Sequence, residues 1–432
     1  MKYIYKYLSL LLSVIMLLSV VGCSPKKAGD MNDDNSEGRS YTLTVWGAEE
    51  DQAMLKEMCN AYAKANSKNK YTFNFGVQGE GEAADKVLND VQSGPDVYSF
   101  SSDQINKLYA GGALARVGGD IETNIKDVNT QESVNAATVT IEGTNQLFAY
   151  PCTGDNCLFL YYDKSVYKNP EDLKSLDKVL STAQSAGKKV HFRLNDDGWY
   201  LSTFFFANPE LKYDVTYNDK MVEQKVAINF DNSSGLDVMK ALRTYLYSDA
   251  LVAQTDDSKI IAAFMSNGGK REAAAAVSGT WNASTIKKLL GDNMGVCKLP
   301  TVKIGGKDMQ LSGYMGYKLI GVNGYSQNKG EAHKLAQWLT NEENQLKRFK
   351  TRGFGPTNKN VTNMEIVQND NVISAVLDQA KYNRAQKSVP ATYWTPMASL
   401  ITPIITAKAN GTNVSDSMLK SYLDALCDQI RK

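Results

Sequence analysis

Strand-like and helix-like segments alternate where the globular part of the chain begins. The strand-like TLTVW (42–46) is followed by an amphipathic helical stretch (52–64), the strand-like YTFNFGV (71–77), a second helical stretch (84–91) and the strand-like PDVYSF (95–100). Strands that alternate with helices indicate a sheet flanked by helices. This order favours an α/β fold, whose ligands bind at the carboxyl ends of the strands.

The rest of the chain continues this pattern. Strand-like runs recur at KKVHFRL (188–194) and AAAAVSG (273–279), and the C-terminal part is mostly helical, ending in a helix over 415–430 behind a Ser-Asp-Ser start signal. A chain of 432 residues is too long for one compact core. We therefore expect two domains.

The N-terminus has the pattern of an export signal. Lys2 and Lys6 precede an apolar run (8–21) that ends in Gly22-Cys23, which predicts a lipoprotein signal peptide over 1–22. LSVVGC (18–23) resembles a bacterial lipobox, in which Cys23 becomes the lipidated first residue; a chance cysteine after an ordinary signal peptide is the alternative. Residues 23–40 are expected to form a flexible tether. These features predict an extracytoplasmic protein anchored to the cell membrane.

Charge and hydropathy argue against nucleic-acid binding and against a membrane-spanning segment after the leader. The full chain has 48 basic and 47 acidic residues, and removal of Lys2 and Lys6 with the leader leaves 46 basic residues and a net charge of −1. Nucleic-acid binding would require a basic face, so we expect none. Apart from the leader, no run of about eighteen apolar residues exists to span a membrane.

The cysteines do not form a complete disulfide framework. Five remain after Cys23, an odd number. Cys59 and Cys427 lie on apolar helical stripes and Cys297 in a strand-like run, so all three are interpreted as small buried hydrophobes. Cys152 and Cys157 bracket a Gly-Asp-Asn turn. Packing thiols are the favoured interpretation there, and a disulfide between them stays open.

Several catalytic motifs are absent from the sequence. Its only histidines, His191 and His333, have no carboxylate at metal-ligand spacing, so no metal site, cofactor or histidine triad is expected. No G-x-S-x-G elbow occurs, and Gly268-Gly269-Lys270 lacks the Ser or Thr of a Walker A motif. A pair of carboxylates that hydrolyses glycosides is not excluded in this way.

Eight blocks of sequence, taken in order along the chain, resemble a known protein family. They are TLTVWGAEEDQAMLKEM, GPDVYSFSSDQINKLYAGGALARV, FAYPCTGDNCLFLYYDKSVY, AAFMSNGGKREAAAAVSGTW, GVCKLPT, LSGYMGYKLIGVNGYSQNKGEAHKLAQWL, GFGPTN and ATYWTPMASLITPI. Together they resemble the solute-binding proteins of ABC sugar importers, above all the maltose/maltodextrin-binding branch. The resemblance covers nearly all of the chain from residue 41 onward.

The resemblance implies a periplasmic-binding-protein-like α/β fold with two lobes. Each lobe is a mixed β-sheet flanked by helices, and the ligand cleft lies between the lobes. The expected boundaries are 41–151 with 315–356 for lobe 1, 156–312 with 360–432 for lobe 2, and 152–155, 313–314 and 357–359 for the hinge crossings.

The resemblance also implies where a saccharide would bind. A pyranose ring has C–H faces and an equator of hydroxyls, so its pocket needs aromatic rings and fixed polar groups. Family positions for the rings fall on Phe100, Trp199, Trp281 and Trp394. Candidate polar partners are Glu49, Glu50, Asp51, Asp103, Gln104, Asp155, Asn156 and Asp196.

Three positions depart from the family pattern. Gln104 and Ala398 stand where arginines are common in maltose-binding members, and Thr395 stands where an aromatic residue is common. The aromatic positions are kept while the polar ones are altered. A site built for particular hydroxyls rejects sugars that lack them, so these changes bear on which sugar binds.

The predicted function is that of a monomeric oligosaccharide-binding lipoprotein without enzymatic activity. Malto-oligosaccharides are the favoured ligand, and hinge closure delivers the ligand to an ABC permease. Xylo- or fructo-oligomers are the alternative ligands. A glycoside-active enzyme and a surface glycan-binding lipoprotein without a transporter are the alternative functions.

Overall fold

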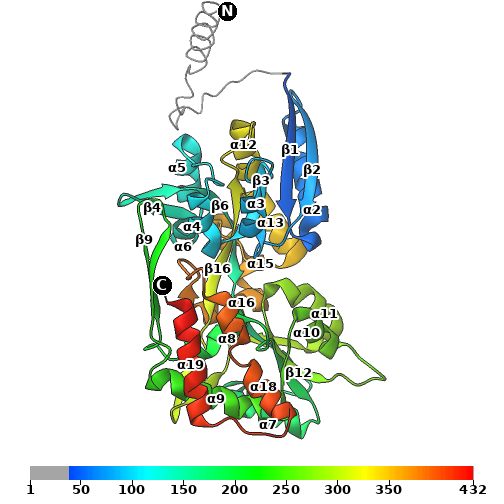
Figure 1. The fold of residues 1–432 in the computed structure, drawn as a ribbon. Helices are drawn as coiled ribbons and strands as arrows, with labels where there is room; N and C mark the ends of the chain where they lie inside the picture. The colour runs from blue at the N-terminus through cyan, green and yellow to red at the C-terminus, as the bar shows by residue number, and fades with distance from the viewer. Residues whose placement is uncertain (1–37, 432) are drawn as a thin grey trace, which may run out of the picture. The chain divides into compact units, whose positions relative to one another are not determined.

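The computed structural model describes residues 38–431 (Figure 1). The predicted leader (1–22), the lipidation site Cys23 and all but the last three residues of the predicted tether lie outside the described residues. Every described residue belongs to one compact unit of the chain. Within this part of the chain, no helix is both long enough and apolar enough to span a bilayer.

A six-stranded sheet contains the first three strands of the chain and three later strands that pair with them or with one another. Its order is β17-β16-β3-β1-β2, and β6 also pairs with β16. β1 runs parallel to β2 and β3, whereas β16 runs antiparallel to β3 and β6. The bounds are β1 (Ser40–Gly47), β2 (Lys70–Val77), β3 (Val97–Ser101), β6 (Ala149–Asn156), β16 (Tyr314–Val322) and β17 (Arg384–Ala385).

A second, five-stranded sheet forms from the middle of the chain. Its order is β11-β8-β12-β7-β13, with β8 parallel to β11 and β12, and β7 antiparallel to β12 and β13. The bounds are β7 (Phe159–Asp163), β8 (Lys189–Phe192), β11 (Leu251–Ala253), β12 (Ala273–Ser278) and β13 (Met294–Cys297). Three hairpins complete the strands: β4 (Thr138–Ile141) with β5 (Thr144–Leu147), β9 (Tyr213–Tyr217) with β10 (Glu223–Ile228), and β14 (Thr301–Ile304) with β15 (Lys307–Gln310).

Helices surround the two sheets, as the sequence predicts. Those in the first half of the chain are α2 (Gln52–Ala65), α3 (Ala83–Asn89), α4 (Ile105–Ala110), α5 (Gly119–Val128), α6 (Gln131–Ala136), α7 (Leu176–Ser185) and α8 (Gly198–Phe205). Those in the second half are α9 (Ser233–Leu246), α10 (Asp257–Phe264), α11 (Ala283–Leu290), α12 (Lys329–Leu339), α13 (Glu342–Arg352), α14 (Lys359–Thr362), α15 (Glu365–Gln368), α16 (Asn371–Ala380), α17 (Trp394–Ser399), α18 (Thr402–Ala409) and α19 (Asp416–Ile430). Short 3-10 helices are η1 (Glu49–Asp51), η2 (Ser102–Gln104), η3 (Pro170–Leu173), η4 (Thr280–Asn282) and η5 (Gly291–Asn293).

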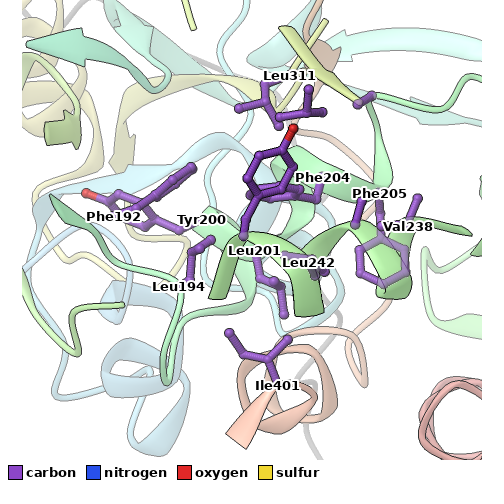
Figure 2. Packing of buried hydrophobic residues seen from close by; sticks show 14 of the residues in the cluster. Phe192, Leu194, Tyr200, Leu201, Phe204, Phe205, Val238, Leu242, Leu311 and Ile401 are labelled. Atoms are coloured by element: carbon purple, nitrogen blue, oxygen red, sulfur yellow. The ribbon is translucent and has the colours of Figure 1, made fainter. Parts of the chain in front are cut away.

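Each sheet has its own hydrophobic core. The stripe of α2 packs on the first sheet and buries Cys59 with its apolar neighbours, as predicted, and α19 buries Cys427 in the second core. Figure 2 shows part of this second core, where side chains of α8 pack beside Val238 and Leu242 of α9 and beside Ile401, the residue before α18. Because α8 is almost entirely buried, it provides a rigid base for residues at its N-terminal end.

The chain passes between the two sheets close to β16. The end of β6 leads directly into β7 of the second sheet. β17, from the segment assigned to lobe 2, pairs through Arg384 with Tyr314 of β16 and so extends the first sheet. The lobe boundaries and hinge crossings expected from the sequence stay a prediction.

Candidate ligand-binding site

A large cavity lies where strand ends of both sheets meet. Its volume is about 680 Å³, and most of its lining residues follow the carboxyl ends of β1, β2, β3, β8, β11 and β12. This is the position at which α/β sheets bind ligands. The lining residues are Glu50, Glu80, Gly81, Glu82, Ser101, Asp103, Gln104, Asn156, Arg193, Asp196, Asp197, Gly198, Trp199, Tyr200, Asp257, Trp281, Lys318, Gln386, Trp394, Thr395 and Ala398.

Three half-buried tryptophans line this cavity. The ring centroids of Trp199 and Trp281 are 5.8 Å apart, with 55° between the ring planes. The ring of Trp394 packs edge-on against Tyr314, at a centroid distance of 5.4 Å. Each ring is therefore held by neighbouring aromatic residues and presents part of its apolar surface to the cavity.

Two glycines allow the tryptophan rings to take these positions. A Cβ at Gly279 would lie 2.0 Å from the ring of Trp281. A Cβ at Gly198 would lie 2.8 Å from the carbonyl oxygen of Trp394. Gly198 is the first residue of α8, so its missing side chain lets α8 approach α17 and brings Trp199 and Trp394 to the same cavity.

The N-terminus of α8 is capped by an aspartate that also faces the cavity. The Asp197 carboxylate accepts hydrogen bonds from the backbone N–H groups of Trp199 (2.8 Å) and Tyr200 (3.0 Å). It lies 3.3 Å from Nε of Arg193. The cap fixes the first turn of α8 and, with it, the backbone that carries Trp199.

Gln386 joins polar groups from both sides of the cavity. Its Nε2 donates to Oδ1 of Asp103 at 3.1 Å, and its Oε1 accepts from Nε1 of Trp199 at 3.0 Å. The same Oε1 also accepts from Nδ2 of Asn156 at 3.3 Å. A Cβ at Gly316 would lie 2.5 Å from that oxygen, so β16 needs a glycine there. The amide of Gln386 thereby fixes an acid, an amide and an indole together.

The remaining polar wall contains charged networks. Arg193 lies 3.1 Å from the Asp257 carboxylate, which also accepts a hydrogen bond from the Tyr200 hydroxyl at 2.7 Å. Nζ of Lys318 lies 3.5 Å from Glu80. Burial alone would lower the pKa of Lys318, but neighbouring carboxylates, Glu80 foremost, raise it, and the ammonium stays charged.

Asp103 is an acid of the cavity wall whose pKa is shifted by its surroundings. Burial raises the pKa of its carboxyl group above the ordinary value, while hydrogen bonds from Ser101 and Gln386 act in the opposite direction. Asp103 follows β3 through η2 and is half-buried in the cavity wall. Its carboxylate can accept a hydrogen bond from a ligand hydroxyl or amine.

Most residues predicted for the site line this one cavity. They are Glu50, Asp103, Gln104, Asn156, Asp196, Trp199, Trp281 and Trp394. The three positions that depart from the family pattern, Gln104, Thr395 and Ala398, line it too. Whether each of them contacts a ligand stays a prediction.

Four predicted residues lie elsewhere. Phe100 is fully buried in the core of the first sheet, where it packs against Tyr98. Asp155 is also fully buried and accepts a hydrogen bond from the Gly355 N–H at 2.9 Å. Glu49 is exposed in η1, and Asp51 forms an ion pair of 2.9 Å with Arg352. None of these four side chains lines the large cavity.

Sequence reasoning missed several lining residues. Glu80, Arg193 and Asp257 follow β2, β8 and β11, so the rule that selected Glu50 after β1 could have found them. Lys318 lies within β16, where a charged residue among apolar ones is itself a signal. Gln386 has no local signal, because its partners are distant in sequence.

The cysteines of residues 38–431 are all free thiols. Cys152 and Cys157 are free thiols buried in the structure, so the disulfide that the sequence left open is not formed. Cys59 and Cys427 are buried and free, as interpreted from their stripes, and Cys297 is half-buried. Across residues 38–431, no group of three or more His, Cys, Asp or Glu side chains is arranged to hold a metal ion.

Solved structures of other proteins share this fold. A chain solved with acarbose is 30% identical, with a TM-score of 0.74, and the match covers 90% of this chain and 98% of that one. The maltodextrin-binding protein of L. casei BL23, solved without ligand, is 22% identical, with a TM-score of 0.71 and coverage of 90% and 99%. The fold is therefore the two-lobed one that the sequence predicts.

Sequence comparison identifies the family. The chain belongs to the bacterial extracellular solute-binding proteins, whose family matches it over residues 57–375. The galactooligosaccharide-binding protein of Bacillus subtilis (strain 168) is 23% identical over 431 residues, which cover 96% of each chain. The resemblance on which the predicted site rests is thus confirmed at the level of the family.

Proposed function

We propose that this protein captures oligosaccharides outside the cytoplasm and delivers them to an ABC permease, without altering them chemically. The observation that carries the proposal is the cavity wall, in which three tryptophan rings alternate with carboxylates and amides. Rings of this kind suit the C–H faces of sugars, and the polar groups suit their hydroxyls. A volume of about 680 Å³ lies within the range of small-molecule sites.

Malto-oligosaccharides are the proposed ligands. Solved structures with this fold include a maltodextrin-binding protein and a chain held with acarbose. Galacto-oligosaccharides are the second candidate, because the relative from Bacillus subtilis is named for them. Gln104, Thr395 and Ala398 alter the polar edge of the cavity relative to the maltose-binding pattern. We therefore expect these three positions to determine which of the two sugars binds more tightly.

Capture requires that the two sides of the cavity close on the ligand. Residues of both sheets line the cavity, so a bound oligosaccharide would contact both at once. Aromatic contacts of about 0.5–1.5 kcal/mol each supply a few kcal/mol. A micromolar ligand needs about 8 kcal/mol, so hydroxyl hydrogen bonds must add much of the remainder. Hinge closure brings these groups together.

The test is calorimetric titration with a panel of malto-, galacto-, xylo- and fructo-oligosaccharides. We expect one series to bind, and Trp281→Ala and Trp394→Ala each to weaken that binding at least tenfold while the protein stays folded. Trp338→Phe is the matched control, because Trp338 lies outside this cavity. Unchanged affinity in both cavity variants would remove the tryptophans from the site.

The same samples distinguish binding from catalysis. Chromatography of the sugars after incubation should recover them at their original length. Shorter products would show a glycoside-active enzyme instead.

Membrane attachment is a separate part of the proposal. Cys23 is the proposed lipidation site, and the anchored protein would work beside its permease. We expect Cys23→Ala to move the protein from the membrane fraction to the medium. Retention of that variant on the membrane would contradict the anchor.

A further inference from the structure

The cavity that we propose for oligosaccharides has an excess of negative charge. Seven carboxylates line it, against one arginine and one lysine. A neutral sugar brings no charge to offset this excess. The distribution of the two cations among the carboxylates therefore bears on the chemical class of the ligand.

Both cations are already committed to carboxylates of the wall. Arg193 lies between Asp197 (3.3 Å) and Asp257 (3.1 Å). Lys318 pairs with Glu80 at 3.5 Å, and both side chains are only 13% exposed. These pairs leave other acids of the cavity without a positive partner.

Three acids that line the cavity have no ion pair within the described residues: Glu82, Asp103 and Asp196. Asp103 accepts hydrogen bonds from Gln386 and Ser101, both of which are neutral, and Lys107, the cation that acts on it, is itself paired with Asp85. Asp196 is exposed near the end of the loop that leads from β8 to α8, with φ at 66°. Glu82, which is exposed, and Asp103 follow strands of the first sheet, whereas Asp196 follows a strand of the second.

Closure around a ligand would remove water from these unpaired carboxylates, above all from the half-buried Asp103. An ionised carboxylate that loses water without gaining a cation weakens ligand binding. A ligand ammonium offsets that cost and donates charge-assisted hydrogen bonds, which are about twice as strong as neutral ones. A hydroxyl donates only a neutral hydrogen bond to the same oxygen.

We infer that the preferred ligand is an oligosaccharide that carries a protonated amine, seated against Asp103 with its sugar faces on the tryptophans. This inference rests on the proposed function and narrows its substrate class to amino-sugar-containing oligosaccharides. The amine contributes selectivity, while the aromatic rings accept any sugar of suitable shape.

The test compares sugars that differ only in the amine. Maltotriose and galactotriose are each prepared as the parent, as three forms with a 6-amino-6-deoxy group on one ring, and as the N-acetylated neutral partners of those forms. Affinities are measured by calorimetry at pH 7 in low and in moderate salt. We expect at least one amine form to bind ten times more tightly than its N-acetylated partner, with a smaller ratio in the higher salt.

Two variants test whether the Asp103 carboxylate causes the preference for the amine form. Asp103→Asn should reduce the amine-to-acetyl ratio at least fivefold. Asp292→Asn, which removes a fully exposed carboxylate far along the chain, should leave the ratio unchanged. If every amine form binds no better than its N-acetylated partner, the inference is overturned while oligosaccharide binding stands. If no saccharide binds at all, the proposed function fails as well.

Discussion

At the scale of single residues, Gln386 does more than line the cavity. Its amide nitrogen donates to Asp103 and its oxygen accepts from Trp199, so one side chain sets the orientation of an acid and of an aromatic ring. A glutamate at this position keeps an acceptor for the indole but cannot donate to Asp103 when ionised. It also places two carboxylates in contact.

We therefore predict that Gln386→Glu weakens oligosaccharide affinity at least tenfold, as measured by calorimetry. Gln337→Glu, a substitution on α12 outside the cavity, serves as the matched control and should change affinity less than twofold. Wild-type affinity in Gln386→Glu would show that the bridge to Asp103 does not matter for binding.

His333 is a second residue with a measurable signature. It is buried on α12, where its Nδ1 lies 2.7 Å from the Tyr150 hydroxyl. Burial, with a smaller contribution from Lys329, lowers the pKa of His333 to about 4. The unfolded chain, with an ordinary pKa near 6.5, then binds a proton that the folded chain excludes. Through His333, the free energy of unfolding is therefore highest above pH 6.5 and decreases as the pH falls from 6.5 to 4.

The prediction is that acidification over this interval costs wild type on the order of 3 kcal/mol of unfolding free energy through His333. His333→Gln keeps a hydrogen-bonding group for Tyr150 but does not titrate. Urea unfolding at several pH values should show a flatter dependence for this variant. A slope equal to that of wild type between pH 6.5 and 4 would contradict the assignment.

At the scale of elements, α8 connects core packing to the site. Seven of its eight residues are buried, and Trp199, the half-buried exception, faces the cavity. Its cap, Asp197, satisfies two backbone N–H groups. Loss of such a cap usually costs about 0.5–2 kcal/mol of stability.

We predict that Asp197→Ala lowers stability by about this amount and also weakens oligosaccharide binding several-fold, because the first turn that carries Trp199 loosens. Ser415→Ala removes the cap of α19, far from the cavity lining, and should lower stability without changing affinity. Thermal unfolding and calorimetry on both variants separate the two effects. Equal affinity in Asp197→Ala and Ser415→Ala would show that the cap of α8 does not influence ligand binding.

The segments near the predicted hinge form another structural element. The Gly154 N–H donates to the Gly355 carbonyl at 2.9 Å, and the Gly355 N–H donates to the Asp155 carboxylate at 2.9 Å. A Cβ at Gly355 would lie 2.9 Å from the Cβ of Asp155. Asp155 therefore links the end of β6 to the segment that contains Gly355, which explains why its carboxylate lies outside the cavity.

At the scale of the whole molecule, ligand binding must stabilise the fold. A ligand that binds only the folded protein adds about 2.7 kcal/mol at a hundred times its dissociation constant. We predict a rise of several degrees in the melting temperature with the cognate oligosaccharide and none with mannitol at equal concentration. Scanning fluorimetry with the sugar panel measures this directly, and an unchanged melting temperature with every sugar would contradict the proposed function.

Periodicity along the chain was enough to predict several strands of each sheet, with the runs at 188–194 and 273–279 containing β8 and β12 of the second sheet. The strand-like runs at 42–46, 71–77 and 95–100 fall within or beside β1, β2 and β3, and the helix expected over 415–430 is α19 with Ser415 as its cap. These elements follow from short-range patterns of apolar residues, which neighbouring parts of the fold reinforce.

The site was predictable only in part. The resemblance selected three tryptophans and Asp103, all of which line the cavity, but it also selected Phe100. Nearly every residue of β3 is buried, since both faces of this strand are covered, so alternation along it does not reveal which side chains reach a ligand. Phe100 pairs with Leu319 in the sheet and points into the core.

The sequence by itself determined the α/β class and the family, and it predicts an export signal, because local periodicity and ordered motifs carry that information. Tertiary structure alone decided that Gln386 meets Asp103 and Trp199, residues 283 and 187 positions away. It also decided that Asp155 is buried against the backbone of Gly355 while Asp103 faces the cavity. Contacts between distant segments depend on how two sheets pack, and no short stretch of sequence records that packing.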